Sequence, residues 1–128
     1  MEDRSRRDGL AVRVSPGAGR GVFATRDRHA GEVLEVAPIL LIPEAQRDAA
    51  LATIVRRYAW GWDGGLAVGL GLISVVNHGV PANARWESDR EACELWLVAT
   101  AAIAAGAEVL VDYSHGGERE LAFTPRPA

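Results

Sequence analysis

The chain reads Asn77-His78-Gly79-Val80-Pro81-Ala82-Asn83 in its second half, and two further stretches accompany this one. Gly19-Arg20-Gly21-Val22-Phe23-Ala24 precedes it, and Ala99–Tyr113 follows it, ending on Asp112-Tyr113. A glycine triplet alone is usually a turn, and an Asn-His pair in a loop usually satisfies its own backbone. The order in which all three stretches occur is therefore more informative than any one of them.

The glycine-rich stretch does not predict a dinucleotide-binding site. It lacks the full Gly-x-Gly-x-x-Gly fingerprint, and Val22–Thr25 directly after it is expected to be extended rather than helical. We interpret Gly17–Gly21 as a flexible loop, in which glycines without a Cβ let the backbone approach a ligand closely.

The remaining pattern predicts many short strands and one main helix. Pro43-Glu44 suits the start of a helix, and an apolar stripe continues from it to Tyr58. Pro38 should divide Val33–Ile42 into two short strands or place it at a sheet edge. Further strands are expected at Leu10–Val14 and Val109–Tyr113, with hairpins turning at Asp63-Gly64-Gly65 and Ser88-Asp89-Arg90. The fold class is therefore mostly β.

Length and composition predict one globular domain. The chain has 128 residues, of which 48% are hydrophobic and 24% are charged, and these values are ordinary for a folded domain. We expect residues 1–9 to be a flexible lead-in and residues 10–128 to form a single domain. The formal net charge of −3 creates no field that would draw the protein to nucleic acid, so no direct nucleic-acid partner is expected.

The sequence also indicates a compartment. The longest apolar run, Val36–Pro43, is far shorter than the roughly 20 residues that span a bilayer. The mixed-charge N-terminus leads into no apolar signal region. Cys93 is the only cysteine, so no disulfide framework can form. We expect a cytoplasmic protein that has no membrane partner and holds no metal.

Taken together, the three stretches resemble the SET domain of protein-lysine methyltransferases, in its minimal, stand-alone bacterial or viral form. The resemblance covers about Leu10–Tyr113. The turn His29-Ala30-Gly31-Glu32 and the aromatic segment Tyr58-Ala59-Trp60-Gly61-Trp62 are also similar to parts of that family. It implies a SET-type fold of short curled β-sheets with one main helix and a C-terminal pseudoknot, in which the last strand passes under a preceding loop.

The resemblance further implies transfer of a methyl group from S-adenosyl-L-methionine to the ε-amine of a lysine in a protein substrate. Gly19, Arg20 and Gly21 would then lie against the cofactor, together with Asn77 and His78.

Tyr113 would be the catalytic residue, at the point where the methyl group meets the amine. Aromatic side chains suit the channel for the lysine stem, since they hold its methylenes and present faces to a cation. Tyr58, Trp60 and Phe123 are the candidates for that channel, with Trp62 beside them. We interpret Trp86 and Trp96 as core residues.

The loop also departs from the family pattern, which runs Asn-His-Ser-Cys-x-Pro-Asn. Gly79 replaces the serine and Pro81 is displaced by one position. Two alternatives therefore stay open: an enzyme that methylates a small amine or carrier-bound metabolite, and a degenerate SET fold that only binds a partner. A homodimer is also expected, with the helix stripe and the Trp60/Trp62 hairpin as its candidate surfaces.

Overall fold

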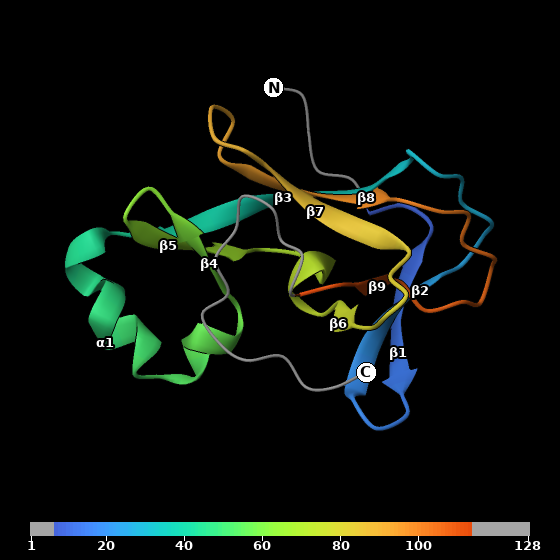
Figure 1. Ribbon diagram of the computed structural model, residues 1–128, viewed down its shortest axis with the longest axis horizontal. Coiled ribbons are helices and arrows are strands. Elements are labelled where there is room, and N and C mark those ends of the chain that lie inside the picture. Colours follow the sequence, from blue (N-terminus) through green and yellow to red (C-terminus); the bar gives the residue numbers. More distant parts are fainter. Residues whose placement is uncertain (1–6, 114–128) are drawn as a thin grey trace.

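The computed structural model describes residues 7–113. Its strands form one sheet of two strands and one curled sheet of seven, which runs in the order β4-β5-β3-β8-β7-β9-β6. The helical residues around α1 lie at one end of the molecule and the β1–β2 hairpin lies toward the other (Figure 1). The strands are β1 (Leu10–Ser15), β2 (Gly19–Ala24), β3 (Val33–Ile42), β4 (Ala59–Trp62), β5 (Gly65–Gly69), β6 (Asn77–His78), β7 (Ala84–Asp89), β8 (Glu94–Ala99) and β9 (Leu110–Val111).

The fold class predicted from the sequence is confirmed. The helical pieces are the α-helix α1 (Arg47–Leu51) and the 3₁₀ turns η1 (Glu44–Gln46), η2 (Ile54–Arg57) and η3 (Leu72–Ser74). No helix among the described residues is long and apolar enough to cross a membrane.

The β1–β2 hairpin corrects the expected loop at Gly17–Gly21. Strand pairing runs without a break from Leu10↔Ala24 to Ser15↔Gly19, so all of Gly19–Gly21 lies in β2. A Cβ on Gly21 would stand 2.3 Å from the Glu108 carboxylate. Glycine in this strand therefore permits a close approach by a distant side chain and does not mark a loop.

Strand β3 is continuous through Pro38, which corrects the expected break. Its first half, Val33–Pro38, pairs with β8, and its second half, Ile39–Ile42, pairs with β5. Pro38 has no N–H to donate, and it stands at the change of partner, where its carbonyl accepts the N–H of Leu70 at 2.8 Å. The proline thus marks an exchange of neighbours within a central strand.

The single helix expected after Pro43 is divided into three short pieces. Thr53 interrupts it: the residue is extended, and its hydroxyl accepts the N–H of Val55 at the start of η2. Neither α1 nor the two flanking turns contain a buried residue, and Ile54 is 66% exposed. The apolar stripe therefore covers no core, and the region keeps its helical character only locally.

Both predicted hairpins are present, but the second turns later than predicted, because Ser88 and Asp89 still pair with β8. Asp63 and Gly64 have positive φ angles of 48° and 86°, as a two-residue turn between β4 and β5 requires. Trp60 and Trp62 on β4 are only 4% and 7% exposed. The Trp60/Trp62 hairpin is therefore wrong as an exposed dimer surface, and the homodimer itself stays a prediction.

Strand β9 produces the expected threading. It pairs in parallel with β6 through Asn77↔Leu110 and with β7 through Ala84↔Val111. Since only residues 79–83 connect β6 to β7, this connection must cross β9. Asn83 holds the crossing: its N–H donates to Leu110 O at 3.0 Å, and its Oδ1 accepts the Leu110 N–H at 2.8 Å.

A buried carboxyl group positions the segment before β6. Glu35 on β3 is 2% exposed and accepts the N–H groups of Leu72 at 2.9 Å and Ile73 at 2.7 Å. These bonds satisfy the first donors of η3, which otherwise have no partner within the turn. Ile73 and Val76 beyond them belong to the main hydrophobic core. Glu35 thus holds the chain at the point where it enters β6.

Glu35 should make stability depend on pH. Burial raises its pKa above the usual 4.5, so the folded protein binds this proton more tightly than the unfolded chain does. That contribution is complete below pH 4.5 and is lost as pH rises through the folded pKa. The difference in unfolding free energy between wild type and Glu35→Gln should therefore fall with rising pH, with a limiting slope of about 1.4 kcal/mol per unit.

Urea denaturation at several pH values measures this difference. Glu87→Gln is the control, because Glu87 is exposed and only pairs with the equally exposed Arg85. Parallel pH curves for wild type and Glu35→Gln would contradict the expectation.

Candidate active site

Asn77 connects all three stretches that the sequence singled out. Its Nδ2 donates to the backbone oxygen of Arg20 at 2.9 Å and to Glu108 Oε2 at 2.9 Å. The structure therefore brings Gly19–Gly21 and Asn77 together, as predicted. Whether these residues bind a cofactor stays a prediction.

Glu108 and Ser15 complete this group, and the sequence reasoning gave neither a role. Glu108 Oε1 accepts the hydroxyl of Ser15 at 2.9 Å. A Cβ at position 21 would collide with Glu108 Oε2 and would stand 2.9 Å from Asn77 Nδ2, so Gly21 is needed for this packing. We call Ser15, Gly21, Asn77 and Glu108 the amide cluster. Gly21 and Glu108 both lie in stretches that the sequence singled out, but nothing in the sequence indicates that they contact each other.

His78 contacts the end of β9. Its Nδ1 accepts the N–H of Tyr113 at 3.0 Å, so this nitrogen carries no proton in that bond. Asp112 Oδ1 lies 3.9 Å from the same nitrogen. His78 therefore positions the Tyr113 backbone directly through Nδ1.

Tyr113 is fixed on several sides. Its hydroxyl donates to the carbonyl of Val76, and its ring lies 5.3 Å from the ring of His78. The indole of Trp86 stacks on it, with centroids 5.0 Å apart and planes inclined by 24°. With its proton held by Val76, the phenol oxygen can act as an acceptor toward a group in front of it.

A small aromatic cavity lies beside Tyr113. Its volume is about 20 Å³, which is room for one water molecule. Two predicted channel residues belong to its wall, the 46%-exposed Tyr58 and the buried Trp60. Trp86 also belongs there and stands edge-on to Trp60, with centroids 5.2 Å apart. Within residues 7–113, the lining is Arg57, Tyr58, Ala59, Trp60, Ile73, Ser74, Trp86 and Tyr113.

Two channel predictions need comment. Phe123 lies outside the described residues. Trp86, interpreted from the sequence as core, is packed against the core but also forms the wall of this cavity. Its strand β7 pairs with β9 only at Ala84↔Val111, so no local pattern shows that Trp86 reaches Tyr113.

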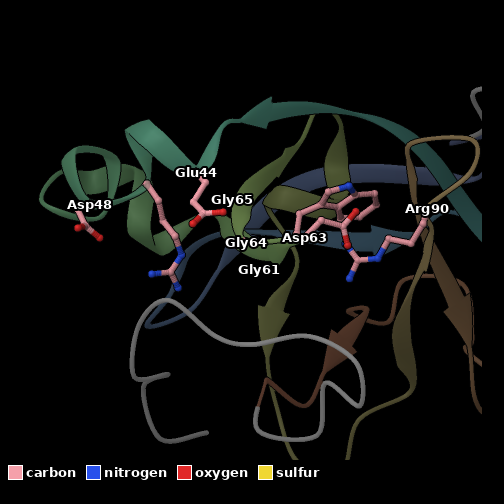
Figure 2. A pocket seen from close by; sticks show the side chains of 9 residues that line it. Glu44, Asp48, Gly61, Asp63, Gly64, Gly65 and Arg90 are labelled. Carbon is pink, nitrogen blue, oxygen red and sulfur yellow. The ribbon is translucent and has the colours of Figure 1, made fainter.

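A second, larger pocket of about 510 Å³ is formed by the helical region and the β4–β5 hairpin. Figure 2 shows Glu44 and Asp48 on its helical side and Arg90 across from them. The guanidinium of Arg90 lies 3.9 Å from the centre of the Trp62 ring, so Trp62 lines this pocket and not the cavity beside Tyr113. Neither the amide cluster nor Tyr113 borders the larger pocket, so its size does not make it the site of chemistry.

Within residues 7–113, no group of three or more His, Cys, Asp or Glu side chains is placed to hold a metal ion. The candidate site therefore consists of two groups of residues beside β6: the amide cluster, and Tyr113 with its aromatic cavity. Asn77 and His78 are neighbours on that strand and connect to one group each.

Comparison with known proteins agrees with this geometry. The SET domain family model matches residues 19–114, which includes β2, β6 and β9 with the motifs that they carry. The chain belongs to the SET-domain family.

A curated relative, from the fission yeast Schizosaccharomyces pombe, is a histone-lysine N-methyltransferase described as specific for H3 lysine 37. It is 31% identical over 85 residues, which is 65% of this chain and 58% of the relative. The chain thus spans little more than half the length of that relative.

Solved structures share the fold at lower identity. A Plasmodium falciparum protein described as a candidate histone methyltransferase has a TM-score of 0.69 at 22% identity, over 84% of this chain and 94% of its own. A chain of the apo ctPRC2 assembly has a TM-score of 0.68 at 23% identity, over 84% of this chain and 15% of its own. These likenesses concern the fold alone.

Trp86 should contribute more to stability than a tryptophan outside the aromatic cavity. Trp86→Leu removes its contacts with both Tyr113 and Trp60, and each aromatic pair contributes about 0.5–1.5 kcal/mol beyond simple burial. We expect the free energy of unfolding to fall by about 2–4 kcal/mol.

Urea denaturation checks this expectation. Trp96→Leu is the matched control, because Trp96 is half-buried on the adjacent strand and belongs neither to the cavity wall nor to the described core cluster. Equal losses in the two variants would show that the aromatic contacts of Trp86 add nothing.

Proposed function

We propose that this chain is an S-adenosyl-L-methionine-dependent protein-lysine N-methyltransferase. One observation carries the proposal: the two groups of the candidate site meet at β6. The phenol of Tyr113 is fixed at the aromatic cavity beside His78, and Asn77, the other residue of β6, belongs to the amide cluster. Membership of the SET-domain family supports this use of the two groups.

The amide cluster fits the amino-acid part of the cofactor. Both described hydrogen bonds of Asn77 use Nδ2, so Oδ1 is available to accept from an ammonium group. Arg20 is exposed and carries a guanidinium that suits a carboxylate. Apart from its two chain neighbours, no described residue has an atom within 4 Å of the place where a Cβ on Gly19 would stand, which leaves space against the backbone. When bound, the cofactor supplies a methyl group on a positively charged sulfur.

The aromatic cavity fits the reacting amine. A lysine with a pKa near 10.4 costs about 4–5 kcal/mol to deprotonate at pH 7. Apolar walls and a nearby positive charge both lower that cost, since they disfavour the ammonium form. Tyr113 would accept a hydrogen bond from the neutral amine and align it, so no separate general base is needed. The cavity has room for about one water molecule, so its wall would have to open to admit a lysine stem.

The acceptor is proposed to be a protein. The fission yeast relative is described as a histone-lysine methyltransferase, and this supports a protein lysine as the acceptor class without identifying the substrate.

Transfer of a labelled methyl group tests the proposal. The purified protein is incubated with methyl-labelled S-adenosylmethionine and a cell lysate, and protein is then separated from small molecules. We expect the label in methyl-lysine recovered from lysate proteins. The chain contains no lysine, so methyl-lysine cannot arise from the enzyme itself. Label only in small molecules would favour the alternative acceptor, and neither transfer nor cofactor binding would favour the binding module.

Tyr113→Phe should impair turnover and leave cofactor affinity nearly intact. The variant keeps the ring and its stacking on Trp86 but removes the oxygen that would align the amine. We expect at least about a tenfold slower single-turnover rate, or about 1.4 kcal/mol in the barrier. Loss of the bond to Val76 should also lower stability by about 1 kcal/mol, so rates are compared well below the melting temperature. An unchanged rate with unchanged cofactor binding would show that Tyr113 is structural.

A further inference from the structure

Ser15 is a buried hydroxyl that acts on a residue far away in the chain. It is the last residue of β1 and is 5% exposed. Its Oγ donates to Glu108 Oε1 at 2.9 Å, across 93 positions of sequence. A donor this well buried usually has a defined partner, and here the partner belongs to the amide cluster.

Glu108 divides its two oxygens between two donors. Oε1 receives the Ser15 hydroxyl, and Oε2 receives Nδ2 of Asn77. Because Ser15 holds one oxygen, the carboxylate cannot rotate freely about its last torsion. The other oxygen is therefore kept at the place where Asn77 needs an acceptor.

This arrangement determines which way the Asn77 amide faces. The backbone oxygen of Arg20 and Glu108 Oε2 are both acceptors, so only the NH₂ end of the amide can face them. Oδ1 must therefore point to the opposite side, where it can only accept hydrogen bonds.

We propose that Ser15 is a positioning residue for ligand binding: through Glu108 it keeps Asn77 Oδ1 directed at the ammonium group of a bound amino-acid moiety. This inference rests on the proposed cofactor, since it concerns the α-amino group of S-adenosylmethionine and of its product. In this proposal Ser15 does not contact the ligand itself. It acts through two intervening side chains, by removing the alternative orientations of the carboxylate and so of the amide.

Ligands with and without the amino-acid part test the proposal. S-adenosylhomocysteine carries the α-ammonium group, whereas 5′-methylthioadenosine keeps the adenosine and the sulfur but lacks that group. Calorimetry gives the dissociation constant of each for wild type and for Ser15→Ala. We expect about fivefold weaker binding of S-adenosylhomocysteine, the equivalent of one hydrogen bond of about 1 kcal/mol, and unchanged binding of 5′-methylthioadenosine.

Two further variants complete the design. Asn77→Ala should weaken S-adenosylhomocysteine at least as much as Ser15→Ala does, because it removes Oδ1 itself. Thr53→Ala is the matched control, since it removes a hydroxyl whose bonds lie within the helical region, and it should leave both constants unchanged.

Two results would overturn the inference. Unchanged S-adenosylhomocysteine affinity in Ser15→Ala would show that the hydroxyl does not position Asn77. An equal loss for both ligands would show that Ser15 only stabilises the hairpin. Failure of wild type to bind S-adenosylhomocysteine is a different outcome, which would reject the proposed cofactor as well.

Discussion

Asn83 bonds the last described strand to the loop that crosses it, and the position of both halves of the candidate site depends on these bonds. Besides its two hydrogen bonds to Leu110, Asn83 donates from Nδ2 to the backbone oxygen of Glu108 at 2.9 Å. Glu108 lies just before β9 and Tyr113 lies just after it. An amide that fixes β9 therefore fixes the carboxylate of the amide cluster and the phenol of the aromatic cavity together.

The backbone of β6 separates two different environments. Successive side chains of a strand point to opposite faces, so Asn77 and His78 extend in different directions although they are adjacent. Asn77 bonds to the Arg20 backbone oxygen in the β1–β2 hairpin and to the Glu108 carboxylate. His78 lies against the ring of Tyr113, which packs on the hydrophobic core. A polar ligand on one side and an apolar stem on the other can thus meet at one strand without either entering the wrong environment.

Local chemistry made part of this structure predictable. The Asp63-Gly64 turn follows from the positive φ angles that such a turn needs, and the fold class follows from the density of short strands. Tyr113 and Asn77 were singled out because the resemblance assigns them roles, and those roles stay predictions. Ser15 and Glu108 were not found, because their contacts depend on segments 93 positions apart. Gly21 lies in a strand because it pairs with Arg13 in the β1–β2 hairpin, and only the distant Glu108 carboxylate explains why this strand position is a glycine.

The helical region and the cavity show a second kind of limit. Residues 44–58 have a helical pattern of apolar side chains, but tertiary packing fully buries no residue of η1, α1 or η2, and a single extended threonine divides the region. Trp86 has the size and position of a core residue, and only the pairing of β7 with β9 turns it toward Tyr113. Propensity and periodicity predict the structure of single segments, whereas the divided helix and the contacts of Trp86 depend on how different segments pack against one another.

The crossing at residues 79–83 also constrains how the chain assembles. A protein is synthesised from its N-terminus at about 5–20 residues per second, so β6, β7 and the loop between them leave the ribosome before β9 exists. The position between β6 and β7 in the sheet stays empty until β9 has been synthesised, and contacts of long sequence separation form slowly. The β1–β2 hairpin and the β3–β5 region can pair early, but the surfaces that carry Asn77 and Trp86 stay incomplete until Leu110 and Val111 arrive. Folding of this domain is thus expected to finish only after β9 has been synthesised, with the candidate binding surface as the last part to form.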